Sequence, residues 1–166
     1  MSAPVLWFTG RPGSGKHTVA DEVVAGLRTR RVPVELLDHA ILETEIGPTA
    51  DPAQRLRYLA ALLQRHGVVS VVISSAADGP AADAARATIP GLIEVFVDTP
   101  REICIHRVGQ RAAMDFEAPV APELRVVTHD REPLASAAQV LSLLDTIDLT
   151  GSAGDTAGRP WASAGK

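Results

Sequence analysis

The glycine-rich segment TGRPGSGKHTVAD, residues 9–21, constrains the fold of this chain more than any other feature. Its Gly10, Gly15 and Lys16 fill the pattern G-x-x-x-x-G-K-[ST], and Gly13 adds a further flexible position. Glycines at this spacing let successive N–H groups converge on phosphate oxygens, and the N-terminus of the following helix adds partial positive charge. Lys16 is expected to be exposed at the loop and to reach the β- and γ-phosphates. The segment therefore predicts a phosphate-binding loop between a strand and a helix.

Short apolar, β-branched segments alternate with helical patterns along the chain. Strands are expected at residues 5–8, 34–37, 68–74, 93–98 and 124–128. Helices are expected at residues 15–31, 51–66, 80–88, 100–107 (with Thr99 as its cap) and 134–144. Nearly continuous apolar strands are typical of a parallel sheet covered on both faces. We expect an α/β fold of the P-loop NTPase type, a three-layer sandwich with a mainly parallel five-stranded sheet and helices on both faces.

Composition narrows the classes of partner. The chain has 166 residues, a length that fits one domain. Its net charge of −4 gives no positive electrostatic field that would attract nucleic acid. The single cysteine, Cys104, fits a reducing compartment. The first residues lack the basic residues of a signal peptide, and no run of about 20 apolar residues is present. We therefore expect a cytoplasmic protein with no membrane span. We expect a P-loop domain over residues 1–149. The tail of residues 150–166 lacks Ile, Leu, Val and Phe, so we expect it to be disordered.

The loop and the first helical turn are expected to bind the nucleotide. The residues concerned are Gly10, Arg11, Pro12, Gly13, Ser14, Gly15, Lys16, His17 and Thr18. His17 departs from the pattern, which has a Mg²⁺-binding hydroxyl at that position, and imidazole is a poor ligand for Mg²⁺. Three alternatives stay open. Thr18 supplies the hydroxyl from one residue further on, water and a carboxylate hold the metal, or metal-dependent transfer is lost.

Five segments, in order along the chain, carry a resemblance to a known family. They are WFTGRPGSGKHTVADEV, VELLDHA, LLQRHGVVSVVISSA, IEVFVDTPREICIHR and APELRVVTHD, and together they cover about residues 5–147. These segments resemble the adenylylsulfate kinase family, whose members begin Trp-x-Thr-Gly before the loop and later have a strand ending in Val-Asp-Thr-Pro. The resemblance implies a kinase-like domain that transfers the γ-phosphoryl group of ATP to the 3′-hydroxyl of adenylylsulfate, using Mg²⁺.

The resemblance also implies roles for single residues. It makes Lys16 and Asp38 the candidate catalytic residues, places Arg107 near the nucleotide, and leaves Thr18 and Asp38 as metal ligands. The candidate residues for binding the acceptor substrate are Asp38, Arg55, Arg57, Ser74 and Arg111. Plain structural roles compete with some of these assignments: Asp38 also fits a turn at a strand end, and the two helical arginines also fit a solvated surface.

Several departures from the family pattern fall on the acceptor side. Ala40 replaces the second aspartate of Asp-Gly-Asp, Ser75 replaces a proline, and GQRAAMDFEAPVAPE is much shorter than the family's lid. We expect an ATP-dependent kinase acting on a hydroxyl of a nucleotide-like or other small molecule. The alternative is a nucleotide-binding pseudokinase, sensor or partner module without phosphotransfer. Members of the family often pair, so a homodimer is a further open alternative.

Overall fold

A computed structural model describes residues 2–75 and 81–147 of the chain. Five strands form one sheet: β1 (Val5–Thr9), β2 (Val34–Asp38), β3 (Val69–Ile73), β4 (Leu92–Val97) and β5 (Leu124–Val126). The helices are α1 (Lys16–Thr29), α2 (His39–Ile46), α3 (Pro52–Arg65), α4 (Ala81–Arg86), α5 (Arg101–Val108) and α6 (Pro133–Asp145), with a short 3₁₀ turn, η2 (Gly109–Ala113). None of these helices is long and apolar enough to cross a bilayer.

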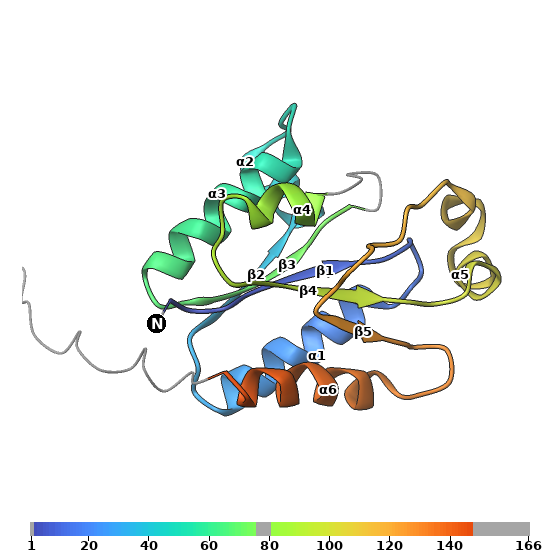
Figure 1. Cartoon of the computed structure of the whole chain (residues 1–166). Coiled ribbons are helices and arrows are strands. Elements are labelled where there is room, and N and C mark those ends of the chain that lie inside the picture. Colours follow the sequence, from blue (N-terminus) through green and yellow to red (C-terminus); the bar gives the residue numbers. More distant parts are fainter. Residues whose placement is uncertain (1, 76–80, 148–166) are drawn as a thin grey trace, which may run out of the picture.

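The sheet has the order β2-β3-β1-β4-β5, and every neighbouring pair is parallel. Strand β1 is therefore central, and the loop that follows it emerges where the chain connections diverge to opposite sides of the sheet. In open parallel sheets this edge, outside the carboxyl ends of the strands, is where ligands bind. Figure 1 shows α5 at that same edge.

Alternation along β1 divides the core into two layers. Leu6 and Phe8 pack with residues of α1 and α6, whereas Val5 and Trp7 pack with residues of α3 and α4. All four side chains are fully buried. The two helical layers lie on opposite faces of the sheet in Figure 1, which confirms the expected three-layer α/β sandwich with helices on both faces.

The predicted strands and helices agree with the structure to within two residues at each end. Two elements were not predicted. Helix α2 follows β2 directly, with Asp38 as its N-cap, and the turn η2 lies in the segment expected to be irregular. The cap expected at Thr99 is wrong, because Pro100 occupies the cap position of α5 and no side chain caps that helix. The expected tail of residues 150–166 lies outside the described residues, so the division at residue 149 stays a prediction.

Candidate functional site

The phosphate loop lies between β1 and α1 and is packed tightly against the rest of the domain. Gly15 takes the N-cap position of α1 with φ 92°, and Gly13 has φ 80°, a left-handed backbone that favours glycine. A Cβ atom on Gly13 would lie 2.9 Å from the carbonyl oxygen of Cys104, and one on Gly15 would lie 3.1 Å from Thr128 Oγ1. The glycines therefore allow both the turn and the close approach of α5 and of the residues after β5.

Two threonines and an arginine hold the carbonyl groups of the loop. The hydroxyls of Thr99 and Thr128 lie 2.9 and 2.5 Å from the carbonyl oxygen of Ser14, and 2.8 Å from each other. Arg107 donates to the carbonyl oxygens of Gly13 (3.1 Å) and Thr128 (3.0 Å) and to Thr128 Oγ1 (3.1 Å). These contacts turn loop carbonyls toward α5 and β5. Fixing the carbonyls on that side favours presentation of the loop N–H groups to an anion.

Lys16 is buried, although the sequence suggested an exposed lysine; its exposed fraction is 5%. Its ammonium donates to the carbonyl oxygens of Gly10 (3.1 Å) and Arg11 (3.2 Å) within the loop. Burial lowers the pKa of Lys16, and the negative charge of Asp38 opposes part of that shift. The lysine is therefore held inside the loop by neutral acceptors, in a place where an incoming phosphate would supply the missing charge.

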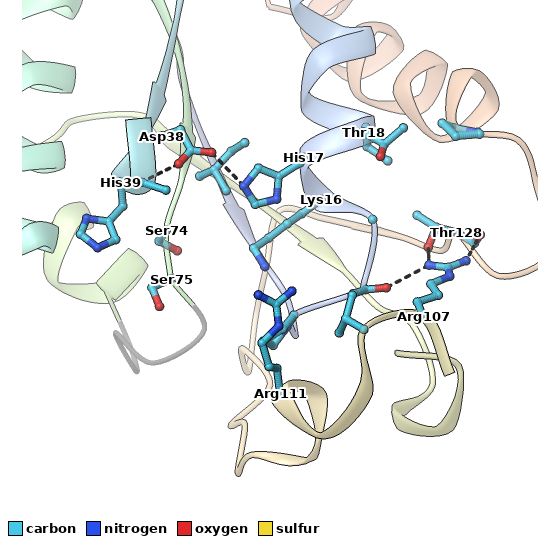
Figure 2. Close-up of a pocket in the computed structure, with 18 of the residues that line it drawn as sticks. Lys16, His17, Thr18, Asp38, His39, Ser74, Ser75, Arg107, Arg111 and Thr128 are labelled. Atoms are coloured by element: carbon cyan, nitrogen blue, oxygen red, sulfur yellow. Dashed lines mark hydrogen bonds and ion pairs between the residues drawn. The ribbon is translucent and has the colours of Figure 1, made fainter. Parts of the chain in front are cut away.

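A cavity of about 690 Å³ opens beside the loop (Figure 2). It gathers sequence-predicted site residues from the loop, from the strand ends and from the segment after α5. These are Pro12, Gly13, Gly15, Lys16, His17, Thr18, Asp38, Ser74, Arg107 and Arg111. The strand-end residues meet here because the carboxyl ends of parallel strands share one edge of the sheet.

Five predicted site residues do not line this cavity. Gly10 and Ser14 lie within the loop, and Ser14 is fully buried. The Arg11 guanidinium donates to the carbonyl oxygens of Ala112 and Met114. Arg55 donates to the carbonyl oxygens of Gly47 and Pro48, and Arg57 lies 4.0 Å from Asp51. The structure thus does not bring Arg55 and Arg57 to the cavity that holds Lys16.

Some cavity residues were missed by sequence reasoning. Thr128 and His39 line the cavity, as do Val108 and Met114. Thr128 lies two residues beyond the end of β5 and His39 directly follows β2. Their positions just past strand ends were the available signal, because those ends meet at the edge that carries the loop.

Asp38 and His17 form a close pair at the cavity wall. Asp38 Oδ2 lies 2.8 Å from His17 Nε2, and its Oδ1 accepts the backbone N–H of Ala40 at 2.7 Å. The Asp38 side chain is 7% exposed and the His17 side chain 60% exposed. The carboxylate is therefore fixed from two sides, by the start of α2 and by the residue after Lys16.

The described residues that line the cavity supply few oxygen ligands for Mg²⁺. Within residues 2–75 and 81–147, His, Cys, Asp and Glu side chains form no group of three that could hold a metal. Thr18 and Asp38, the two residues predicted to supply oxygen ligands, lie on opposite sides of the first turn of α1, with Asp38 directed toward His17 (Figure 2). Mg²⁺ in proteins usually keeps several waters and takes one or two carboxylates together with phosphate oxygens of the substrate. Asp38 is the carboxylate available to such an ion here, and one of its oxygens is paired with His17.

A glycine loop at the carboxyl edge of a parallel sheet, with a lysine at the start of the next helix, defines a P-loop protein that binds phosphate groups. The family model described as "Adenylylsulphate kinase" matches residues 2–111. The chain belongs to the adenylylsulphate kinase family. It thereby falls among ATP-dependent phosphotransferases with an alcohol group as acceptor.

Individual relatives agree with the family match. A probable adenylyl-sulfate kinase of Pseudomonas aeruginosa is 34% identical over 152 residues, which cover 76% of this chain and 70% of that protein. The adenylyl-sulfate kinase of Lactiplantibacillus plantarum is 33% identical over 165 residues, covering 84% of this chain and 80% of the relative. The structure of the Mycobacterium tuberculosis APS kinase in complex with AMPPNP and APS superposes with a TM-score of 0.72 at 29% identity, over 87% of this chain and 98% of that one.

Proposed function

We propose that this protein transfers the γ-phosphoryl group of ATP to a hydroxyl of a small acceptor, nucleotide-like or otherwise. One observation carries the proposal: the buried Lys16 of the phosphate loop and the carboxylate of Asp38 line the same 690 Å³ cavity. That volume lies within the range of about 300–1,000 Å³ usual for small-molecule sites. A phosphate donor and an alcohol acceptor can therefore meet in one cavity.

The loop and the first turn of α1, residues 10–18, are proposed to hold the ATP phosphates. The loop N–H groups and Lys16 face the phosphate chain, and Arg107 supports the loop from behind through Gly13 and Thr128. Phosphoryl transfer depends mainly on positioning and on stabilising charge. Lys16, Arg107 and Arg111 supply three positive charges around this cavity.

The acceptor is proposed to enter on the side of Asp38 and Ser74, which line the cavity across from the loop. The acceptor oxygen forms a bond to the γ-phosphorus while the bond to the β–γ bridging oxygen breaks and ADP leaves. The hydroxyl proton passes to Asp38, whose carboxylate is held in place by His17 and by the Ala40 amide. Arg55 and Arg57 have no proposed role, because they bond elsewhere.

The family uses ATP, typically with Mg²⁺, and bound Mg²⁺ neutralises charge on the β- and γ-phosphates. Among the described cavity residues Asp38 is the one carboxylate that would hold such an ion, and it is already paired with His17, so the proposed positioning rests mainly on the chain's own cations. Thr18 and Asp38 remain the residues proposed to supply oxygen ligands to the ion.

An activity screen tests the proposal. Purified protein is incubated with ATP, with and without Mg²⁺, and with adenylylsulfate or a panel of nucleosides and other alcohols, and ADP is measured. The proposal expects acceptor-dependent ADP formation that the Lys16→Ala variant lacks. ADP release that no acceptor increases would contradict it.

A nucleotide-binding protein without transfer is the second candidate. It is favoured by the engagement of both oxygens of Asp38, one by His17 at 2.8 Å and one by Ala40 N at 2.7 Å, because these partners occupy the oxygens that an acceptor hydroxyl would approach. This candidate predicts ATP binding that barely depends on Mg²⁺. Calorimetry with ATP, ADP, GTP and adenylylsulfate, each with and without Mg²⁺, measures how far binding depends on the metal. A strong Mg²⁺ requirement together with turnover would exclude the binding protein without transfer.

A further inference from the structure

The short segment after α5 forms a fixed wall of the cavity. Arg11 Nη1 donates to the carbonyl oxygens of Ala112 (3.3 Å) and Met114 (2.6 Å), and Arg101 Nη2 donates to that of Ala113 (2.8 Å). Three successive carbonyls are thus bonded to arginines from two other elements, the phosphate loop and α5. Ala112 is fully buried as well. A segment held in this way lacks the freedom of a lid that swings open.

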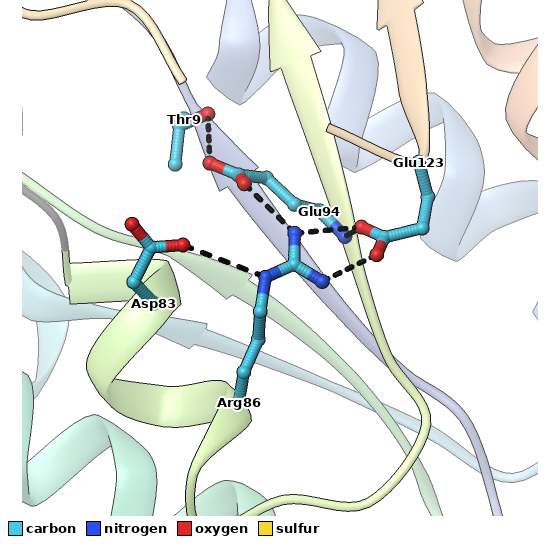
Figure 3. Close-up of polar contacts among 5 residues, drawn as sticks. All are labelled: Thr9, Asp83, Arg86, Glu94 and Glu123. Atoms are coloured by element: carbon cyan, nitrogen blue, oxygen red, sulfur yellow. Dashed lines mark hydrogen bonds and ion pairs between the residues drawn. The ribbon is translucent and has the colours of Figure 1, made fainter. Parts of the chain in front are cut away.

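Further contacts fix the same segment beyond η2. The Phe116 ring stacks on Phe96 of β4, with ring centroids 6.0 Å apart, and the Arg11 guanidinium lies 5.3 Å above the Phe116 ring. At the far end, Glu123 accepts the backbone N–H of Glu94 at 2.6 Å and pairs with Arg86 (Figure 3). Residues 112–114, Phe116 and Glu123 are therefore anchored to the rest of the domain.

Arg111 is presented into the cavity by this fixed segment. It lines the cavity with Lys16, and Figure 2 shows its guanidinium on the Lys16 side, away from Asp38 and Ser74. Within the described part of the chain, no hydrogen bond or ion pair reaches this guanidinium. The neighbouring Arg11, Arg101 and Arg107 all bond to backbone carbonyls. Arg111 is thus a cation aimed at the phosphate loop with its hydrogen-bonding capacity unused.

We propose that Arg111 binds the terminal phosphate of a nucleoside triphosphate and that Arg11 positions it there from within the loop. The inference rests on the proposed nucleotide binding and goes beyond it by assigning selectivity for triphosphate over diphosphate. A planar guanidinium matches the oxygens of a phosphate with paired hydrogen bonds. Lys16 reaches the phosphates from the loop, so Arg111 contacts the end of the chain that a diphosphate lacks. Because the wall is already in place, this contact needs no closing movement.

Calorimetric titrations with ATP and with ADP test the role of Arg111. In Arg111→Gln the Kd for ATP should rise about tenfold or more, as for loss of a charged hydrogen bond, while the Kd for ADP changes less than about twofold. Arg111→Lys keeps the charge but not the planar fork, so its Kd for ATP should lie between those of the wild type and Arg111→Gln. Equal losses for ATP and ADP, or a rise only in the KM of an acceptor, would overturn the assignment.

A double-mutant cycle tests the positioning role of Arg11. Arg11→Met should lose selectivity for ATP over ADP although Arg11 does not line the cavity, and Arg11→Met combined with Arg111→Gln should be no worse than Arg111→Gln alone. Multiplying losses would instead show that Arg11 acts independently of Arg111. Arg11→Lys provides the same measurement with the charge retained if the methionine variant folds poorly. Arg28→Gln, on the exposed end of α1, is the matched control and should keep the wild-type ratio.

These binding measurements are independent of turnover. A wild-type protein that prefers ATP over ADP, loses the preference in Arg111→Gln and releases no ADP with any acceptor would refute the kinase proposal and support the assignment of Arg111. Turnover by the wild type, together with an unchanged preference for ATP in Arg111→Gln, would support the kinase proposal and refute the assignment of Arg111.

Discussion

His17 Nε2 lies 2.8 Å from Asp38 Oδ2, a contact that joins the first turn of α1 to the end of β2 at the cavity wall. In the pattern of the phosphate loop, the residue at the position of His17 carries a hydroxyl that binds a metal ion. Here an imidazole takes that place and meets the carboxylate directly. The contact couples the loop to the acceptor side of the site, and it removes one carboxylate oxygen from the ligands that a metal or an acceptor hydroxyl would use.

Replacing His17 tests whether its contact with Asp38 weakens the dependence of ATP binding on Mg²⁺. His17→Ser supplies a hydroxyl and releases Asp38, so ATP binding or hydrolysis should become more dependent on Mg²⁺. His17→Ala releases Asp38 without supplying a hydroxyl and is the matched control. The measurement is calorimetric ATP binding with and without Mg²⁺. An equal gain in Mg²⁺ dependence in both variants would assign the effect to the released carboxylate. No gain in either variant would assign the weak Mg²⁺ dependence to Ala40 and the short segment of residues 109–123 instead.

Asp38→Asn separates the chemical role of Asp38 from its structural one. The amide oxygen can still cap α2 by accepting the Ala40 N–H, but the side chain no longer takes a proton. We expect kcat to fall about a hundredfold, in the range for loss of a general base, while the Kd for ATP stays within about twofold. Asp51→Asn makes the same change at the cap of α3, outside the cavity, and should leave both quantities unchanged. A normal kcat in Asp38→Asn would remove Asp38 from the transfer step.

Lys16→Ala should weaken ATP binding more than tenfold, because the lysine charge is expected to meet the β- and γ-phosphates. The fold should survive for a reason different from the exposure expected at first. The carbonyls of Gly10 and Arg11 lose a donor, but the cost of burying an ammonium group disappears too. These effects oppose each other, so the unfolding free energy should change by about 1 kcal/mol or less. Titration with ATP and urea unfolding of the same samples measure both, and normal ATP affinity would contradict the site assignment.

The regular part of the fold could be predicted from periodicity and from the glycine loop. Strands such as Leu92–Val97 are buried along their whole length, and runs of this kind carry a strong signal of their own. Helix α2 was missed because its sequence, HAILETEI, has no buried residue and so shows no amphipathic pattern. Asp38 was interpreted for its chemistry, and its second role as the cap of that helix was overlooked.

Side-chain partners across the fold were beyond prediction from sequence. Thr99 preceded Pro100 in the way a helix cap does, yet its hydroxyl bonds to the carbonyl of Ser14, 85 residues away in the chain. Arg11 is part of the phosphate loop, but its guanidinium reaches the carbonyls of Ala112 and Met114. Contacts at such separations follow from the strand order, and local patterns do not encode them.

The cluster of Arg86, Glu94 and Glu123 should make stability depend on pH (Figure 3). Burial alone would raise the pKa of Glu123, but hydrogen bonds from Arg86 and from the Glu94 amide outweigh it and leave this pKa below its ordinary value. A carboxyl group with a lower pKa in the folded state stabilises the protein above its unfolded pKa of about 4.3. That contribution is lost as the pH falls through the folded-state pKa.

Glu123→Gln tests this prediction, because the amide oxygen still accepts the Glu94 N–H but does not titrate. Glu123 is partly exposed, so the wild type should be more stable than the variant by only about 1 kcal/mol at pH 7. The difference should persist to about pH 5 and be smaller at pH 3, because the carboxylate takes up a proton as the pH falls below its unfolded pKa. Urea unfolding at these three pH values measures it. Glu35→Gln, on the exposed side of β2, should show no such trend, and a difference for Glu123→Gln that stays constant down to pH 3 would mean that the ion pair with Arg86 does not stabilise the fold.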